Sequence, residues 1–404
     1  MATLSVRCAI AGGGPAGMML GLLLARAGVE VVVLERHADF LRDFRGDTLH
    51  PSTLEVMHEL GALDRLLSLP HQKVTKVTGH LGGVSVTVAD FTGLRMRCPF
   101  VAFMPQWDFL DFLAREAERY PTFQLRMNAD VTGLIEEAGS VVGVRSVTSD
   151  GPLDVHAALV VGADGRHSVV RPAAGLAREE FGAPMDVLWF RLPRHPGDPA
   201  DPVGRLGAGQ VLVMLNRDEY WQCGFLIPKG SRERLEGRGL PEFREAIAGL
   251  APFAAGRVDT LREWDQVKLL TVRIDRLRRW YRPGLLCIGD AAHAMSPVGG
   301  VGINLAIQDA VAAANLLAAP LRAGRVAVAD LARVQRRREW PARMTQRLQL
   351  AVQRRVIERA LSGQQVVALR FAVRLLAWAP FLRRIPALAI GRGFRPEHVR
   401  TPPL

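Results

Sequence analysis

Residues 8–35 read CAIAGGGPAGMMLGLLLARAGVEVVVLE, and this stretch decides the fold. Two apolar runs, Cys8–Ala11 and Val29–Leu34, enclose the glycine-rich turn Gly12–Gly17 and a helical pattern, and Glu35 ends the second run. The glycines permit a tight turn and the close approach of a pyrophosphate, while an acid about 20 residues further on can hold ribose hydroxyls. The stretch therefore predicts a strand–helix–strand unit that binds a dinucleotide.

A second ligand-contacting segment lies far along the chain, at residues 289–309, with the sequence GDAAHAMSPVGGVGINLAIQD. It comes after an apolar run that predicts a strand and precedes an alanine-rich helical pattern. Asp290 can accept hydrogen bonds from sugar-like hydroxyls, and the loop glycines let backbone N–H groups approach a flat ring. A helix that begins near Gly302 turns its positive end toward the same place. Distant parts of the chain are thus expected to contact one ligand.

Composition sets the broad class. The chain has 404 residues, of which 49% are hydrophobic, so it can form two or three domains with large cores. Residues 1–7 lack the pattern of a signal peptide, and no stretch of about 20 uncharged apolar residues predicts a membrane span. The four cysteines are scattered without metal-ligand spacing, which favours a reducing cytoplasm and no metal site.

A third segment, VVGADGRHSVVR at residues 160–171, completes a pattern. The order and spacing of the three segments resemble those of the single-component FAD-dependent aromatic hydroxylases, the para-hydroxybenzoate hydroxylase-like flavoprotein monooxygenases. Two smaller matches agree with this. Arg45-Gly46-Asp47 resembles the family's arginine-bearing loop beside the flavin, and Pro105-Gln106 resembles the Pro-Gln pair whose amide contacts the flavin chain. The resemblance extends over nearly the whole chain, to about Leu321.

The resemblance implies FAD as a tightly bound, non-covalent cofactor. It assigns the catalytic positions to Pro297, Gly299 and Arg45. The cofactor contacts that we expect are Gly12, Gly14, Pro15, Ala16, Gly17, Glu35, Arg36, Arg45, Gln106, Val131, Asp164, Gly165, Gly289, Asp290, Pro297, Gly300, Gly302, Ile303 and Asn304. His293 comes soon after Asp290 on a crowded turn, and we interpret it as structural rather than as a catalytic base.

The resemblance also implies a reaction. NADH or NADPH would bind transiently and reduce FAD, and O₂ would then give a flavin C4a-hydroperoxide that hydroxylates an electron-rich, aromatic or polyketide-like molecule. Two other functions remain open: an FAD-dependent reductase or dehydrogenase of the same fold, and a flavin-binding protein without turnover. The expected substrate-binding residues are Trp189, Arg191, Trp221, Phe225, Phe103 and His50.

The expected fold class is mixed α/β, with a Rossmann-like FAD-binding domain, an inserted antiparallel β-sheet substrate domain and a C-terminal helical segment. The FAD-binding domain is discontinuous and comprises residues 1–73, 100–170 and 267–335. The β-rich substrate domain comprises residues 74–99 and 171–266. The basic helical segment comprises residues 336–404, and we expect helix breaks at Pro341, Pro380 and Pro386.

The positive charge is concentrated near the C-terminus. Residues 331–404 contain 16 arginines and three glutamates, which accounts for the whole formal charge of +12. The stretch 366–390 mixes arginines with apolar residues, so weak contact with an anionic membrane surface is one interpretation. The favoured one is a pair of helices packed on the FAD-binding domain with arginines in solvent. No aromatic-interleaved basic face is evident, which argues against nucleic-acid binding. The oligomeric state stays open.

Overall fold

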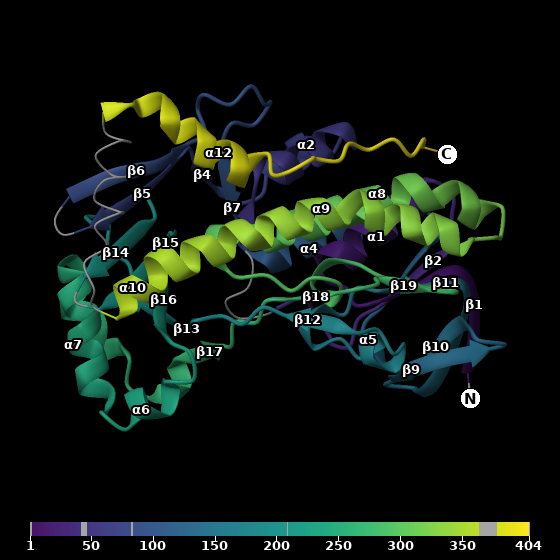
Figure 1. Ribbon diagram of the computed structural model, residues 1–404, viewed down its shortest axis with the longest axis horizontal. Helices are drawn as coiled ribbons and strands as arrows, with labels where there is room; N and C mark the ends of the chain where they lie inside the picture. The colour runs from purple at the N-terminus through teal and green to yellow at the C-terminus, as the bar shows by residue number, and fades with distance from the viewer. Residues whose placement is uncertain (1, 42–46, 82–83, 208, 363–377, 404) are drawn as a thin grey trace.

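A computed structural model describes residues 2–41, 47–81, 84–207, 209–362 and 378–403 (Figure 1). One large sheet has the order β19-β20-β11-β1-β2-β8, with β10 and β9 added through β11. Its strands are β1 (Ala2–Ala11), β2 (Val31–Leu34), β8 (Phe123–Arg126), β9 (Asp130–Glu137), β10 (Ser140–Thr148), β11 (Gly151–Gly162), β19 (Tyr281–Arg282) and β20 (Leu285–Cys287).

A second sheet has the order β17-β13-β16-β15-β14-β5-β6. Its strands are β5 (Lys76–Leu81), β6 (Val84–Asp90), β13 (Met185–Pro193), β14 (Val203–Gly207), β15 (Gln210–Arg217), β16 (Tyr220–Pro228) and β17 (Lys268–Leu270). Two small sheets contain β3 (Thr48–Leu49), β7 (Val101–Phe103) and β4 (Gln72–Val74), and β12 (Arg178–Glu180) with β18 (Asp275–Leu277). The mixed α/β class is confirmed.

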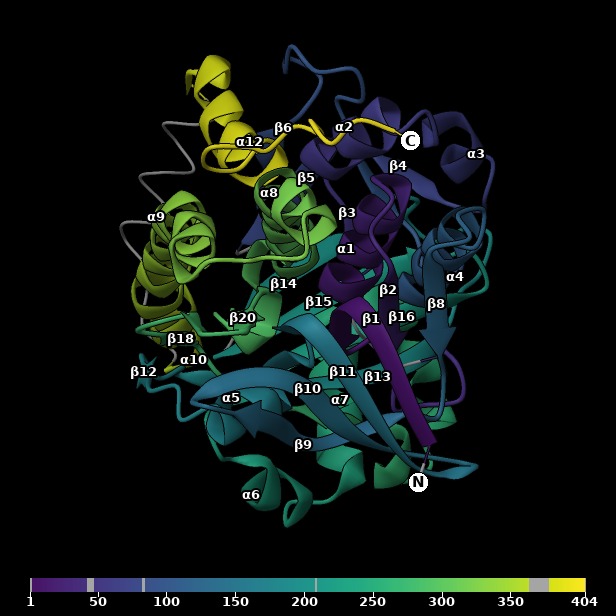
Figure 2. The same ribbon diagram turned by 90° about the vertical axis from the view of Figure 1, so that its right-hand side faces the viewer.

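The helices are α1 (Pro15–Arg26), α2 (Pro51–Glu59), α3 (Leu63–Leu67), α4 (Gln106–Ala117), α5 (Val170–Ala173), α6 (Arg232–Glu236), α7 (Leu240–Leu250), α8 (Gly302–Arg322), α9 (Val328–Val352), α10 (Glu358–Leu361) and α12 (Arg384–Gly391). In Figure 2, α1 and α8 lie on one side of strands β1, β11 and β20, and α5 lies on the other side, near β9 and β10.

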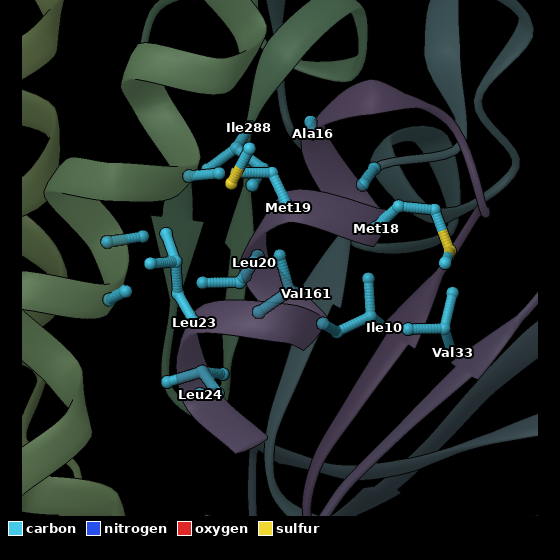
Figure 3. Packing of buried hydrophobic residues seen from close by; sticks show 14 of the residues in the cluster. Ile10, Ala16, Met18, Met19, Leu20, Leu23, Leu24, Val33, Val161 and Ile288 are labelled. Carbon is cyan, nitrogen blue, oxygen red and sulfur yellow. The ribbon is translucent and has the colours of Figure 1, made fainter. Parts of the chain in front are cut away.

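The segment 8–35 folds as its pattern predicts. β1 pairs in parallel with β2 and with β11, and β11 pairs in parallel with β20. Helix α1 starts at Pro15, a residue suited to a first turn, and it is buried on nearly all sides, as expected of a helix between a sheet and α8. Figure 3 shows Leu20 and Leu23 of α1 close to Val161 of β11.

Helix α8 and the turn before it form the apolar centre of the domain. Residues 298–322 have the length and composition of a membrane-crossing helix, but 78% of the apolar window is buried inside the protein. That burial is typical of a core helix, because α8 packs between α1 and α9.

The predicted break at Pro341 is wrong. Helix α9 runs through Pro341 without interruption, and the boundary expected at residue 335 falls inside this helix. A proline removes one N–H and crowds the preceding turn, which costs about 3 kcal/mol in an isolated helix. Packing against α8 and β19 on one face offsets this in α9.

The chain after α12 runs back over the FAD-binding domain (Figure 1). Asn315 of α8 donates to the His398 carbonyl and accepts from the Arg400 N–H, both at 2.8 Å. Glu59 of α2 accepts hydrogen bonds from His398 and from the Val399 N–H. Arg26 of α1 donates to the Thr401 carbonyl at 2.7 Å. We call residues 395–401 the C-terminal strap.

Candidate functional site

Four predicted ligand segments meet at the carboxyl ends of neighbouring parallel strands. The turn Gly12–Gly17 comes after β1, Glu35 after β2, Asp164-Gly165 after β11, and Gly289-Asp290 after β20. The sheet order places these strands side by side. Ligands of open α/β sheets bind at this edge, so segments hundreds of residues apart form one site.

The glycine-rich turn has the shape needed for a pyrophosphate. The Gly13 N–H donates to Glu35 Oε2 at 2.9 Å, which ties the turn to β2. A Cβ at Gly17 would overlap the Gly12 carbonyl, whereas a Cβ at Gly14 would meet no atom within 4 Å. The turn is therefore closed on its inner side and open at Gly14, just before the N-terminus of α1, where an anion is favoured.

Glu35 is poised as a hydrogen-bond acceptor. It is largely buried, and burial alone raises the pKa of its carboxyl; hydrogen bonds from His37 and from the Gly13 N–H outweigh this and hold the pKa below its usual value. The group is thus an anion at neutral pH, as ribose binding requires. The Ala129 N–H donates to the Glu35 carbonyl at 2.8 Å, so the predicted contact Val131 lies two residues beyond a residue bonded to Glu35. Arg36 is exposed.

Asp164 and Asp290 are the acidic residues at the carboxyl ends of β11 and β20. Asp164 Oδ2 accepts the Val169 and Val170 N–H groups at 2.7 and 3.0 Å. Its Oδ1 is buried and has no partner in the part of the chain that the structure describes. The Arg166 guanidinium lies 3.4 Å from Asp290 Oδ2, with both side chains half-buried. A buried acceptor without a partner, beside an open glycine turn, fits a bound ligand that supplies hydroxyl donors.

The loop between β20 and α8 is held from one side by Asn304. Its Oδ1 accepts from the His50 N–H and from Thr53 Oγ1, both at 2.7 Å, and its Nδ2 donates to the Thr48 and Gly300 carbonyls. The amide is therefore fully used within the protein, and a cofactor contact of Asn304 would come from its backbone. Pro297 and Gly300 are partly exposed on this loop, as are Gly302 and Ile303 at the start of α8.

A buried charge cluster supports the turn that carries Asp290. Asp309 accepts the Gly289 N–H at 3.1 Å, His293 Nε2 at 2.5 Å and Arg338 Nε at 2.9 Å. Burial raises the pKa of Asp309, but His293 and Arg338 lower it more, so the pKa stays below its usual value. His293 is 1% exposed and its partner lies in the core, which supports the structural interpretation of this histidine.

The remaining assigned residues differ in their surroundings. Gln106 is the first residue of α4, and its backbone bonds to Asp47. Arg45, assigned both to catalysis and to the cofactor, lies outside the described residues.

The expected substrate residues that belong to the second sheet divide between its two faces. Trp189 packs over Gly224 and belongs to an apolar cluster with Val298 of the loop before α8. Arg191, on the same face of β13, is exposed, with its guanidinium 4.9 Å from the centre of the Tyr220 ring. These two residues lie on the face that turns toward the loop.

Phe103 and His50 lie on the side of α12. Phe103 packs with Val74, Phe91 and Ala387. The His50 Nδ1–H donates to the Ile390 carbonyl at 2.8 Å, and burial lowers the pKa of His50 to about 4, so this imidazole is neutral.

Trp221 and Phe225 do not lie on the same face of the second sheet as Trp189. Both are buried on the opposite face of β16: Phe225 packs edge-on against Phe243 of α7 at 5.2 Å, and Trp221 against Phe253 at 5.7 Å. Side chains alternate along a strand, so odd-numbered residues of β16 face α7 and even-numbered ones face the other way. Both faces of β16 are buried, and its sequence gives no polar alternation to tell them apart.

Sequence reasoning missed a buried ion pair that joins the end of β15 to the residue before β3. Arg217 of β15 pairs with Asp47 at 2.5 Å, and its Nε donates to Gln222 Oε1 at 3.1 Å. Burial raises the pKa of Asp47, and the attraction of Arg217 offsets this only in part. The signal in the sequence was a lone arginine at a strand end, which is indistinguishable from a solvated charge.

Other chemistry has less support. No three possible metal ligands lie together within the described ranges. All four cysteines are free and buried. Two surface hollows, of about 260 and 370 Å³, lie on the outer face of α9 beside Arg336 and Glu339, and neither includes a residue assigned to the cofactor.

Comparisons with known proteins agree with this geometry. A family described as an FAD binding domain matches residues 5–347. The chain is similar to the 6-methylpretetramide 4-monooxygenase of Streptomyces rimosus, with 33% identity over 380 residues, which are 93% of this chain and 91% of that protein. It is 29% identical over 313 residues to the anhydrotetracycline monooxygenase of Streptomyces rimosus, which covers 75% of this chain and 60% of that protein.

Solved structures share the fold. The OxyS anhydrotetracycline hydroxylase from Streptomyces rimosus superposes with a TM-score of 0.76 at 24% identity, over 96% of this chain and 76% of that one. The structure of pqsL, a probable FAD-dependent monooxygenase from Pseudomonas aeruginosa, gives a TM-score of 0.74 at 21% identity, over 89% of this chain and 99% of that one. At such identities the likeness shows the fold alone.

A parallel sheet with a glycine-rich turn after the first strand and an acid at the end of the second is typical of a dinucleotide-binding fold. The family match covers most of the sequence, so the chain belongs to the FAD binding domain family. The resemblance inferred from the three segments and the FAD cofactor are confirmed. The two relatives described above are named as monooxygenases, and the chain is an FAD-dependent monooxygenase.

Proposed function

We propose that this enzyme hydroxylates a polycyclic aromatic, polyketide-like molecule with NAD(P)H and O₂. The proposal rests on one observation. Trp189 of the second sheet and Val298 of the loop before α8 pack against the same apolar cluster, so the cofactor-binding strand ends and this face of the second sheet lie next to each other. The named activities of the relatives on pretetramide and anhydrotetracycline support this substrate class.

Each part of the cofactor edge would have its own role. The Gly12–Gly17 turn and the α1 N-terminus bind the pyrophosphate, Glu35 the ribose, and Asp290 the ribityl hydroxyls. FAD, when bound, supplies the redox chemistry with NAD(P)H and O₂. Pro297 and the Gly299–Asn304 backbone border the ring, and the N–H groups of this backbone stabilise negative charge there. The apolar wall with Trp189 excludes water from the reacting carbon.

The two regions have separate duties in this proposal. Residues 1–73, 100–170 and 267–335 bind the cofactor, and the segments 74–99 and 171–266 shape the substrate pocket. The sheet of the second region also includes β17 (Lys268–Leu270), just beyond these bounds. NAD(P)H binds transiently, with Asp164 and Gly165 near its path. A cytoplasmic location is supported by the four free cysteines, each of them buried.

The test is a screen of polycyclic phenols that reads NAD(P)H consumption, O₂ uptake and product mass. A product that gains one oxygen, with O₂ uptake in equal amount, supports hydroxylation. NAD(P)H consumption with no oxygen incorporated would favour the reductase or dehydrogenase. A yellow protein that no NAD(P)H and substrate combination reduces would favour a binding protein without turnover.

The substrate face is tested by Trp189→Ala. The lost contact removes about 1.5–3 kcal/mol of apolar stabilisation, so kcat/KM falls about 10- to 100-fold while bound FAD is retained. Trp264→Ala is the matched control, because Trp264 packs with Phe243 on the far face of the same sheet. The placement of the pocket is wrong if both variants lower kcat/KM equally.

A contact with an anionic membrane surface is a second proposal, supported by one observation. Trp378, Phe381 and Ile385 are 85%, 69% and 63% exposed, and Arg383 and Arg384 lie among them. Basic and apolar side chains together suit an anionic lipid interface. We expect co-sedimentation with phosphatidylserine vesicles at low salt, weakened by added salt and by joint replacement of Trp378 and Phe381 with alanine. Trp340→Ala, also half-exposed but on α9, should bind as the parent does; absence of binding by the parent removes the proposal.

A further inference from the structure

Helix α9 turns a polar face toward the core. Its buried side chains include Gln335, Arg338, Gln346 and Gln349, and Gln353 continues the row in the π-helical turn after it. Successive members are three or four residues apart or a multiple of that step, so they form one stripe along the helix. Burying polar side chains destabilises the protein unless each polar group makes a hydrogen bond. The hydrogen-bond partners of this stripe therefore indicate which part of the protein it supports.

The amides of this stripe bond to loop backbone and to Asp275, the first residue of the short strand β18, and not to another helix. Gln335 accepts the Trp280 N–H and donates to the Arg278 carbonyl, both at 3.0 Å. Gln346 donates to the Asp275 and Ala294 carbonyls at 2.8 and 3.1 Å. Backbone that lies outside helices and sheets needs such partners when it is buried, and α9 supplies them.

The bonds converge on the two residues that flank Pro297. Gln349 accepts the Ser296 N–H at 3.2 Å and donates to the Ser296 and Val298 carbonyls, both at 2.9 Å. Gln353 donates to Ser296 Oγ at 2.5 Å, and the same oxygen accepts the Val298 N–H at 3.2 Å. Both glutamines are almost fully buried, at 4% and 0% exposure. The backbone on both sides of Pro297 is therefore fixed at both its carbonyls and its N–H groups.

The torsional preferences of the two glycines after Val298 do not fix the conformation of the loop. Gly299 and Gly300 have φ of +81° and +61°, a region that glycine enters without strain, so their torsional preferences add little rigidity. The Gly300 N–H donates to the Pro297 carbonyl at 3.0 Å, and the Gly300 carbonyl accepts from Thr48 Oγ1 and Asn304 Nδ2. The conformation of the two glycines therefore depends on the anchored residues before them and on the residues that hold the Gly300 carbonyl. A shift of about 1 Å in a positioning element can change a rate about 100-fold.

We infer that Gln349, assisted by Gln353, is a positioning residue that orients the Pro297–Gly300 backbone against FAD. This inference rests on the proposed placement of FAD beside that loop. In this inference α9 helps to position the cofactor, although its most evident feature in the sequence is its high arginine content.

The test compares two amide deletions on the same helix face. Gln349→Met keeps the side-chain length and removes all three bonds to the loop; Gln335→Met does the same at Trp280 and Arg278, away from the loop. We expect both apoproteins to lose stability to a similar degree. Only Gln349→Met should weaken FAD binding, by at least about tenfold, or about 1.4 kcal/mol, alter the absorption spectrum of the bound flavin and release more H₂O₂ per NAD(P)H.

Gly299→Ala tests separately whether FAD lies beside the loop. An alanine at this positive φ is strained and disturbs the loop directly, without involving Gln349. If Gly299→Ala weakens FAD binding but Gln349→Met acts no differently from Gln335→Met, the inference is overturned and the placement stands. If Gly299→Ala leaves FAD binding and the flavin spectrum unchanged, the placement is overturned and the inference falls with it.

Discussion

Replacing Asp309 with alanine is expected to lower the free energy of unfolding by about 3–5 kcal/mol and to release FAD. The carboxylate is fully buried and is shared by His293, Arg338 and the Gly289 N–H. Its removal leaves a buried guanidinium with Glu397 as its remaining acidic partner among the described residues, at 3.3 Å. The turn that presents Asp290 also loses its anchor. Urea unfolding of the apoprotein and flavin fluorescence titration measure the two effects.

Glu136→Gln is the control for this variant. Glu136 also pairs with an arginine, Arg282, at 2.8 Å, but on the surface, where such a pair contributes at most about 1 kcal/mol. Its stability and FAD affinity should stay near those of the parent. Equal effects of the two substitutions would show that the buried cluster does not support the FAD site.

Two alanine substitutions in the glycine-rich turn are expected to separate folding from FAD binding. Gly14→Ala adds a methyl group where the protein leaves space and where φ is −72°, so the apoprotein should unfold within about 0.5 kcal/mol of the parent. The methyl group would occupy the space of the pyrophosphate, and overpacking of about 1–3 kcal/mol should weaken FAD binding by about 10- to 100-fold.

Gly17→Ala should act on the fold itself. Its Cβ would overlap the Gly12 carbonyl, so β1 and α1 must move apart, and we expect the apoprotein to lose about 3 kcal/mol or more. Thermal unfolding of both apoproteins measures the loss of stability, and FAD titration of the folded fraction measures the loss of affinity. Together they distinguish a destabilised fold from a blocked pyrophosphate site. A Gly14→Ala protein that binds FAD as tightly as the parent would place the pyrophosphate elsewhere.

The cofactor edge could be predicted from the sequence because its signals are local. Gly12–Gly17 with Glu35 fixes a strand–turn–helix–strand geometry within 28 residues of chain, and Asp164 and Asp290 each end an apolar run. Parallel strands then bring such ends together, whatever their separation in the sequence. No tertiary information was needed beyond the order of the strands.

The substrate face and α9 could not be predicted because their signals depend on packing. Trp221 and Trp189 are equally apolar, and only the partner helix α7 decides which of them is covered. The glutamines of α9 read as an ordinary polar helix surface, because the loop they hold is distant in the sequence. Pro341 predicts a helix break because helix propensity is a local property, and it does not include the packing that stabilises α9 on both sides of the proline.

The C-terminal strap has a consequence for biosynthesis. Its residues bond to partners far upstream: Arg26 lies 375 residues before Thr401, and Glu59 lies 340 residues before Val399. On the ribosome, Arg338 is therefore translated well before Glu397, the second carboxylate that neutralises it in the core. Until residue 397 has been synthesised, Asp309 is the acidic side chain among the described residues that can pair with Arg338, so the strap is expected to dock after the rest of the domain has folded.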